Sequence, residues 1–507
     1  MNNFKKYVLP IVVFLTGACV LVIEVVATRI LSPYYGSTIY TVSSVIGVVL
    51  AALSVGYYFG GKLADKYPTE KFFYSIILFS GFAVVILHLL TLSFLPYMGY
   101  RFSMISGPLL FSLILFFIPS LILGTLSPFT IKLQEKYFPE KGIGSISGEI
   151  FFWSTLGSIF GSLFTGFFLI PHFGINQIVL GVAILLILLG LLPLIKIGLS
   201  KKTLTKVLVL SFLLVSSVVL LANVNNRNII YSYDGLYAKY SIFDREYRGK
   251  QVRFLIQDRA SSSATFLDSD DLVFDYSKYY FLHKFLKSDI KNTLVIGGGA
   301  YSIPKIMLRD LPNAEVDVSE VEASLYEIAQ KYFALTKSDR LHNFTDDGRR
   351  CLYDTNKEYD FIFSDVYNGL SVPAHFTTRE FFELAKNKMS SEGIFMANLI
   401  GDLDGKESPF ILSEIKTFQA VFPNSYFFAS ESPENTGTQN IIFLGYNSDQ
   451  KIDWQNLELN KEDQEFILPL LAKEIDLNKF DFSKAMIFTD NHAPVEYLTA
   501  KVLKNIF

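Results

Sequence analysis

Long apolar runs fill the first 222 residues of this 507-residue chain, and they restrict its fold more than any other feature. A helix needs about 20 mostly apolar residues to cross the hydrocarbon of a bilayer. The first such run is too long, and is followed by too many others, to be a cleaved signal peptide. We therefore expect residues 1–223 to form a multi-pass helical bundle, about seven spans, in a cell membrane. The predicted spans are residues 7–30, 39–60, 72–95, 107–131, 146–170, 175–196 and 204–223.

Small residues and one acid stand out within these spans. Gly56 with Gly60, and Gly157 with Gly161, are pairs four positions apart, which allow neighbouring helices to approach closely. Glu24 lies inside the first span. A charge within the membrane is costly, so it predicts either a functional site or a partner near one interface. Copies of the chain could also associate through this bundle into a homo-oligomer.

The charges of the short loops predict a cytoplasmic N-terminus, because lysine and arginine collect on that side. Seven spans would then place the rest of the chain outside, away from the cytosolic supply of nucleoside cofactors, unless one apolar stretch does not cross. The sequence leaves both arrangements open. The inner loops would hold Lys5, Lys6, Lys62, Lys66, Lys71, Lys132, Lys136, Lys141, Lys196, Lys201, Lys202 and Lys206, and the outer side only Arg29, Arg101 and Arg227.

After Asn223 the chain becomes an ordinary mixture of charged and apolar residues, long enough to bury a core of its own. Residues 224–270 contain short β-like runs such as "QVRFLIQ" and predict a small antiparallel sheet. Residues 271–507 alternate strands with helices, which is typical of a parallel, doubly wound sheet. The fold class we expect is thus a membrane bundle followed by an α/β domain with a small β subdomain at its start.

Composition excludes several classes of partner. The net charge of −3, without a basic stripe, predicts no nucleic-acid partner. The two cysteines, Cys19 and Cys351, are far apart, and the six histidines are scattered. Neither a disulfide framework nor a metal site follows from such spacing, so we expect no metal.

The candidate binding residues of the second half lie where its predicted strands end, which is where open α/β sheets bind ligands. Glycines let a backbone approach a ligand closely. An acid at the end of the next strand, about 20 residues on, can hold both ribose hydroxyls. The pattern is not GxGxxG and no phosphate-binding lysine follows, which favours a ribose and base without a pyrophosphate. The residues are Gly297, Gly298, Gly299, Glu320, Asp347, Gly348 and Asp365.

These residues resemble the spermidine synthase (polyamine aminopropyltransferase) family and, more closely, its membrane-fused branch. The likeness covers residues 230–445 and extends to "GGKLADKYP", "DVYNGLSVPAHFTTREFF" and "FTDNHAPVEYL". It implies a small β domain before a Rossmann-like, methyltransferase-type core. It also implies S-adenosylmethionine or its decarboxylated form as the substrate, with a polyamine as its partner.

The resemblance also assigns roles to single residues. By match, Glu320 holds the ribose, while Asp347 and Gly348 hold the edge of the adenine. The glycine triplet borders the methionine part of the ligand. Tyr276, in "FDYSKYY", falls where the family places a tyrosine beside the active site.

Two positions depart from the family pattern. The glycine triplet of the family is usually followed by an aspartate that grips the aminopropyl amine, whereas this chain has Ala300 and then Tyr301. The family's loop after the third core strand carries two aspartates, and the second takes a proton from the attacking amine. Here the first is Asp365, but the second position is Asn368. An amide cannot act as a general base near neutral pH.

These losses leave two hypotheses for the reaction. Both reactions break the same sulfonium–propyl carbon bond and release methylthioadenosine. One is aminopropyl transfer to an amine, with Asp365, Tyr367 or Asp490 as the base. The other is a lyase acting on intact S-adenosylmethionine, whose carboxylate Ala300 would not repel. That carboxylate could attack within its own molecule, without a base, and give homoserine lactone.

Two further hypotheses remain open. The same core could transfer a methyl group. Alternatively, the bundle is a transporter or sensor that binds a substrate at Glu24, and the second half only detects a nucleoside. The loop "GGKLADK" resembles one in major facilitator transporters, although seven spans without a second copy count against a complete transporter of that type.

Overall fold

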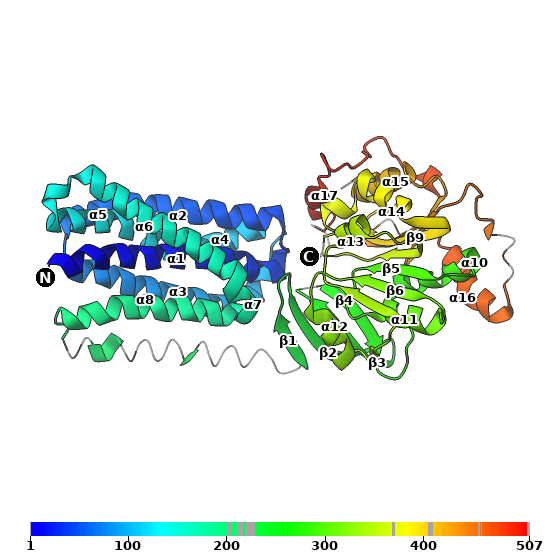
Figure 1. Cartoon of the computed structure of the whole chain (residues 1–507), viewed down its shortest axis with the longest axis horizontal. Helices are drawn as coiled ribbons and strands as arrows, with labels where there is room; N and C mark the ends of the chain where they lie inside the picture. Colours follow the sequence, from blue (N-terminus) through cyan, green and yellow to red (C-terminus); the bar gives the residue numbers. More distant parts are fainter. Residues whose placement is uncertain are drawn as a thin grey trace. The chain divides into compact units, whose positions relative to one another are not determined.

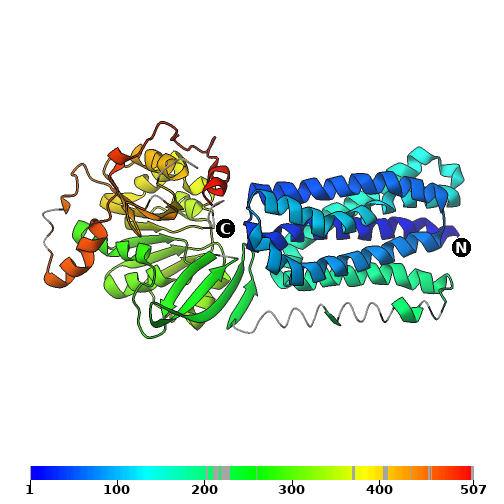
Figure 2. The same cartoon turned by 180° about the vertical axis from the view of Figure 1, so that it is seen from behind.

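The structure is a computed structural model. It describes residues 2–200, 202, 204–207, 209, 216–217, 229–258, 260–367, 371–403, 409–435, 437–454, 457 and 459–503. The chain divides into two compact units, Met1–Asn228 and Ile229–Phe507. The first is a bundle of long helices, and the second combines sheets with helices (Figure 1; Figure 2).

Six helices of the first unit, within the described residues, are long and apolar enough to cross a membrane. They are Tyr7–Tyr35, Ile39–Lys66, Glu70–Met98, Ser106–Tyr137, Ile143–His172 and Ile175–Lys196. Each corresponds to one of the first six predicted spans. The seventh, residues 204–223, lies mostly outside the described residues. The helices are α1 (Asn2–Tyr35), α2 (Ile39–Lys66), α3 (Glu70–Met98), α4 (Ser106–Gly124), α5 (Leu126–Tyr137), α6 (Ile143–Phe164), α7 (Ile170–His172) and α8 (Ile175–Lys196), with the short turns η1 (Gly99–Arg101), η2 (Pro139–Lys141) and η3 (Thr165–Leu169).

The glycine pairs hold helices of the first unit together, as their spacing predicted. A Cβ at Gly56 on α2 would clash with the carbonyl oxygen of Leu121 on α4. A Cβ at Gly157 on α6 would clash with the carbonyl oxygen of Phe14 on α1. Each pair therefore lets two backbones touch, which no larger residue would allow.

The second unit begins with a four-stranded antiparallel sheet, in the order β1-β2-β3-β4. Its strands are β1 (Tyr231–Asp234), β2 (Lys239–Tyr247), β3 (Lys250–Gln257) and β4 (Ala260–Phe266). Val252, Phe254 and Ala264 form part of a small apolar core on it. The antiparallel lead-in predicted from the sequence is confirmed.

A seven-stranded sheet follows, in the order β10-β11-β9-β8-β5-β6-β7. Neighbours among β9, β8, β5, β6 and β7 pair in parallel, but β11 is antiparallel to β9 and β10. The predicted parallel sheet is confirmed for the strands from β5 to β9, but the edge formed by β11 and β10 is antiparallel and was not predicted. The connection from β10 to β11 is too short for a crossover helix, so the chain reverses. The strands are β5 (Asn292–Ile296), β6 (Glu315–Ser319), β7 (Leu341–Phe344), β8 (Tyr359–Ser364), β9 (Met389–Gly401), β10 (Ser425–Ala429) and β11 (Gln439–Tyr446).

Helices cover both faces of this sheet. One apolar cluster joins the sheet to α11, α12, α16 and η4, and another joins it to α13, α14, α15 and α17. The strand order changes direction at β5, which pairs with both β6 and β8, so the segments after β5 and β8 meet at one edge. The helical elements are η4 (Asp275–Leu282), α10 (His283–Leu286), α11 (Ser302–Asp310), α12 (Ser324–Tyr332), α13 (Gly348–Asp354), η5 (Ala374–Phe376), α14 (Arg379–Asn387), α15 (Phe410–Gln419), α16 (Lys461–Leu471), η7 (Leu477–Lys479) and α17 (Val495–Leu503).

Candidate functional site

A cavity of about 620 Å³ opens at that edge of the large sheet and extends to the serines of β4. Most of the residues predicted from the sequence line it together. Ala300 is not part of this lining, and Asn368 lies outside the described residues. The predicted residues in the lining are Tyr276, Gly297, Gly298, Gly299, Glu320, Asp347, Gly348, Asp365 and Tyr367.

The glycine turn after β5 is required by the backbone. Gly297 and Gly299 have positive φ angles of 89° and 54°, which glycine adopts without strain. The N–H of Gly297 donates to the carbonyl of Ser319 at 2.9 Å, and a Cβ at Gly297 would clash with the carbonyl oxygen of Asp365. The turn is thus wedged between the ends of β6 and β8. Its contact with a ligand remains a prediction.

Glu320 organises the same turn from the end of β6. One carboxylate oxygen accepts the N–H groups of Gly298 at 2.9 Å and Gly299 at 3.1 Å. The other accepts the N–H of Glu322 at 2.9 Å. Burial raises the pKa of Glu320, and the three N–H groups oppose that rise. The sequence predicted that Glu320 binds a ribose, but it did not predict that Glu320 also holds the glycine turn through these hydrogen bonds.

Ala300 and Tyr301, which follow the glycine triplet, both pack inward. Ala300 is 2% exposed, and its N–H donates to the hydroxyl of Ser263 on β4 at 3.1 Å. Tyr301 is fully buried in the left-handed conformation, with φ 60° and ψ 28°. Its hydroxyl contacts the side chain of Asn343. Beside the glycine turn, this chain thus has the methyl group of Ala300 and the hydroxyl of Ser263.

Asp365, at the end of β8, forms the centre of a buried polar network. Its carboxylate accepts the hydroxyl of Tyr276 at 2.8 Å and the amide of Asn398 at 2.9 Å. The amide oxygen of Asn398 accepts the side chain of Asn440 at 2.9 Å. Burial raises the pKa of Asp365, although Asn398 and Tyr276 oppose this. The sequence missed both asparagines, whose only signal was a polar residue within an apolar strand.

Tyr367 lines the cavity two residues after Asp365. Its hydroxyl accepts the N–H of Ile400 at 2.5 Å. Burial, followed by the carboxyl groups of Asp365 and Glu414, raises its pKa well above the usual value. The phenol therefore stays protonated at neutral pH, where it can donate a hydrogen bond but not act as a base.

Asp347, predicted as a binding residue, caps helix α13. One oxygen accepts the N–H groups of Arg349 at 2.9 Å and Arg350 at 3.2 Å. The other lies 2.9 Å from Nε2 of His375, which also lines the cavity. Burial alone would raise the pKa of Asp347, but His375 and the helix N–H groups outweigh it and lower the pKa. Sequence reasoning did not single out His375.

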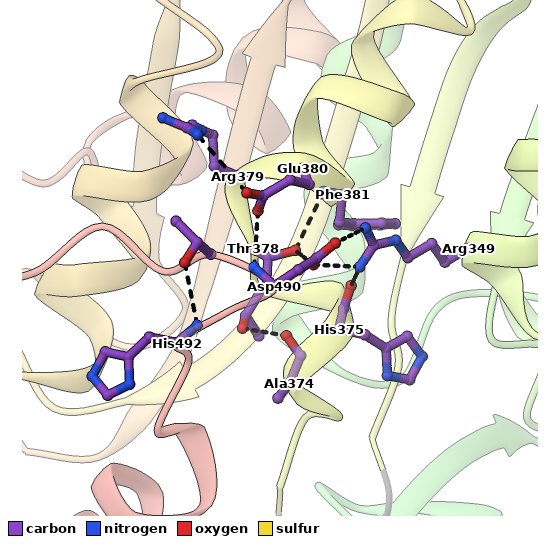
Figure 3. Close-up of polar contacts among 11 residues, drawn as sticks. Arg349, Ala374, His375, Thr378, Arg379, Glu380, Phe381, Asp490 and His492 are labelled. Carbon is purple, nitrogen blue, oxygen red and sulfur yellow. Dashed lines mark hydrogen bonds and ion pairs between the residues drawn. The ribbon is translucent and has the colours of Figure 1, made fainter.

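Asp490 is not among the residues that line the cavity. Its carboxylate pairs with the guanidinium of Arg349 at 2.7 and 2.5 Å and accepts the hydroxyl of Thr378 at 2.7 Å (Figure 3). Arg349 is the main cause of its lowered pKa. Of the three candidate bases, Asp365 and Tyr367 therefore border the cavity. The described residues contain no group of three or more acidic, histidine or cysteine side chains arranged to hold a metal.

Comparisons with known proteins find one matching family model and several similar proteins for the second unit. Residues 282–455 match the family model described as Spermine/spermidine synthase domain. A polyamine aminopropyltransferase of Vibrio vulnificus is 24% identical over 305 residues, 57% of this chain and 98% of that protein. The eEF1A lysine and N-terminal methyltransferase of Homo sapiens is 30% identical over 172 residues, 31% of this chain and 23% of that protein. A solved structure, a probable spermidine synthase from Corynebacterium glutamicum, has 21% identity and a TM-score of 0.43, covering 52% of this chain and 97% of that one.

Proposed function

Because this chain belongs to the spermidine synthase-like family, we propose that it is a membrane-integrated aminopropyltransferase. It would break the sulfonium–propyl carbon bond of decarboxylated S-adenosylmethionine, pass the aminopropyl group to a polyamine, and release methylthioadenosine. The family match and the aminopropyltransferase relative support the reaction class. The six long apolar helices support the membrane location.

The cavity suits a nucleoside that carries positive charge. Its volume of about 620 Å³ lies within the range of small-molecule sites, roughly 300–1,000 Å³. Carboxyl groups from three strand ends line it, at Glu320, Asp347 and Asp365. Arg248 also lines it, but its guanidinium is paired with Asp275 at 2.8 and 3.0 Å. A bound sulfonium supplies an electrophilic carbon and a neutral leaving group.

The arrangement of Asp365 carries the proposal. Tyr276 and Asn398 occupy one site on each carboxylate oxygen and leave further lone pairs free. Burial raises the pKa of Asp365 above its usual value, which makes its carboxylate a stronger general base. Asp365 would take one proton from the ammonium group of the polyamine. The freed amine nitrogen then attacks the propyl carbon, and the electron pair of the broken bond leaves with sulfur.

One observation favours a second candidate, a lyase acting on intact S-adenosylmethionine. The family's amine-gripping aspartate is replaced by Ala300, whose surroundings offer the hydroxyl of Ser263 instead. Such a site would not repel the carboxylate of the intact substrate. Attack by that carboxylate on the propyl carbon closes a lactone and expels methylthioadenosine, with no proton to remove.

Product analysis with the purified full-length protein distinguishes the candidates. The protein is incubated with decarboxylated S-adenosylmethionine, with and without putrescine, and separately with S-adenosylmethionine, and products are identified by mass spectrometry. Amine-dependent methylthioadenosine supports the proposal, and homoserine lactone from S-adenosylmethionine alone supports the lyase. S-adenosylhomocysteine would mean methyl transfer. Nucleoside binding without any product would favour the sensor or transporter.

Asp365→Asn tests the assigned base within the same assay. The amide keeps the shape of the carboxylate but cannot accept a proton, so aminopropyl transfer should fall by about 100-fold or more. Asp354→Asn is the matched control, because Asp354 is an exposed carboxylate that pairs with Arg350 at the surface. Full amine-dependent activity in Asp365→Asn would remove Asp365 as the base.

A further inference from the structure

The C-terminal segment "FTDNHAP" makes a turn that has no part in the chemistry proposed above, and its Asp490 contacts Arg349, which in turn contacts His375 of the cavity lining. Two backbone hydrogen bonds between Thr489 and His492, at 3.1 and 2.9 Å, close the turn. Asp490 lies within it, and its N–H donates to the carboxylate of Glu380 on α14 at 3.0 Å. The backbone of the turn is therefore fixed by its own hydrogen bonds, independently of the Asp490 side chain.

The carboxylate of Asp490 receives donors from two other elements. Arg349 of α13 donates through both terminal nitrogens, and Thr378, which caps α14, donates its hydroxyl (Figure 3). Bidentate pairs of this kind fix direction as well as distance. The side chain of Arg349 is 23% exposed and that of Asp490 is 46% exposed, so solvent screens the charge attraction, and the two-point geometry is what fixes the arginine.

Arg349 links Asp490 to a residue that lines the cavity. Its guanidinium also donates to the carbonyl oxygen of His375 at 3.2 Å, and its own N–H donates to Asp347. The ring of His375 reaches the second oxygen of Asp347 at 2.9 Å. A continuous chain of contacts therefore runs from Asp490 through Arg349 and His375 to Asp347, and the last two line the cavity.

The carboxylate of Asp347 is consequently held on both oxygens. The N-terminal N–H groups of α13 fix one oxygen, and the imidazole fixes the other. An ionised carboxylate only accepts hydrogen bonds. A purine with a 6-amino group can donate to it, whereas a 6-oxo purine presents another acceptor and leaves buried polar groups unpaired. The position of the carboxylate decides how sharply the site distinguishes the two bases.

We propose that Asp490 and Arg349 are positioning residues that hold His375 against Asp347 and thereby make the site selective for a 6-aminopurine. The proposal rests on the proposed function, since it needs a nucleoside in the cavity. Within the lining, the carboxylate of Asp347 meets the base, and His375 holds that carboxylate in position. Asp490 acts from outside the cavity, through Arg349.

Binding of two nucleosides to the purified full-length protein tests this. The probes are 5′-methylthioadenosine and its 6-oxo analogue 5′-methylthioinosine, measured by calorimetry, and the readout is the ratio of the two dissociation constants. Asp490→Asn should lower the preference for the amino form by about tenfold, equivalent to about 1.4 kcal/mol. Asp354→Asn, which breaks an exposed ion pair on the same helix, should leave the ratio unchanged.

The ratio of the two dissociation constants separates a positioning role from general damage to the fold, because general damage weakens the binding of both nucleosides by the same factor. An unchanged ratio in a folded Asp490→Asn protein overturns the proposal, while the proposed function stands. If Asp490→Asn does not fold, His375→Ala must lose the same preference, and an unchanged ratio there also overturns it. Wild-type protein that binds neither nucleoside refutes the proposed function and the positioning chain together.

Discussion

Removing the hydroxyl of Tyr276 should shift the pH dependence of catalysis in a direction that the structure fixes. In Tyr276→Phe the carboxylate of Asp365 loses a buried hydrogen bond of 2.8 Å. That bond stabilises the ionised form, so its loss raises the pKa of Asp365 further. The base must be ionised to act, and the acidic limb of kcat/KM therefore moves to higher pH.

The magnitude follows from the type of bond. A hydrogen bond to a charged group contributes about 1.5–3 kcal/mol. Each 1.4 kcal/mol is a factor of ten, so kcat/KM below the acidic limb should fall by about 10- to 100-fold. Above the limb, Asp365 is ionised in both proteins, and the rates should nearly agree.

The assay is the initial rate of methylthioadenosine release across pH, with amine in excess. Tyr279→Phe is the matched control, since Tyr279 is a buried tyrosine on the same element, η4, whose hydroxyl donates to the carbonyl of Ala429 at 2.9 Å. Tyr279→Phe should lower the stability of the folded protein but leave the acidic limb of the kcat/KM profile at the same pH. A limb that does not move in Tyr276→Phe would refute Asp365 as the base.

Three further results are expected. Burial raises the pKa of Glu414 well above its usual 4.5, so the unfolded chain ionises first and stability falls as pH rises above about 4.5. In Glu414→Gln the free energy of unfolding, measured with urea, should no longer fall with pH in this range. A fall as steep as in the wild type would contradict the raised pKa of Glu414. Gly297→Ala forces a Cβ into a positive φ beside the carbonyl of Asp365 and should cost about 1–3 kcal/mol, which an unchanged melting temperature would exclude. Glu320→Gln leaves one acceptor where the carboxylate accepts three N–H groups, and should weaken methylthioadenosine binding by about tenfold, which unaltered affinity would contradict.

Local signals in the sequence were sufficient for the elements that carry the site. The apolar run before Gly297 predicted β5, and its glycines predicted the turn. Asp347 and Thr378 precede helices that they cap in the structure. These features depend on residues close in sequence, because capping and turn geometry are local. The reversal of β11 depends instead on a connection too short for a crossover.

The partners of the site residues could not be read from local pattern. Asn398 reaches Asp365 from β9, and His375 reaches Asp347 from a loop, so each contact is set by the fold. Tyr301 adopts a left-handed conformation that favours glycine, because its buried ring compensates for the strain.

The fate of the propyl carbons tests the central claim most directly. Decarboxylated S-adenosylmethionine, labelled with ¹³C in its aminopropyl group, is incubated with the purified protein and putrescine, and the products are followed by NMR. The account predicts a labelled carbon bonded to the nitrogen of the former putrescine, together with unlabelled methylthioadenosine. Label that remains bonded to sulfur in the products would contradict it.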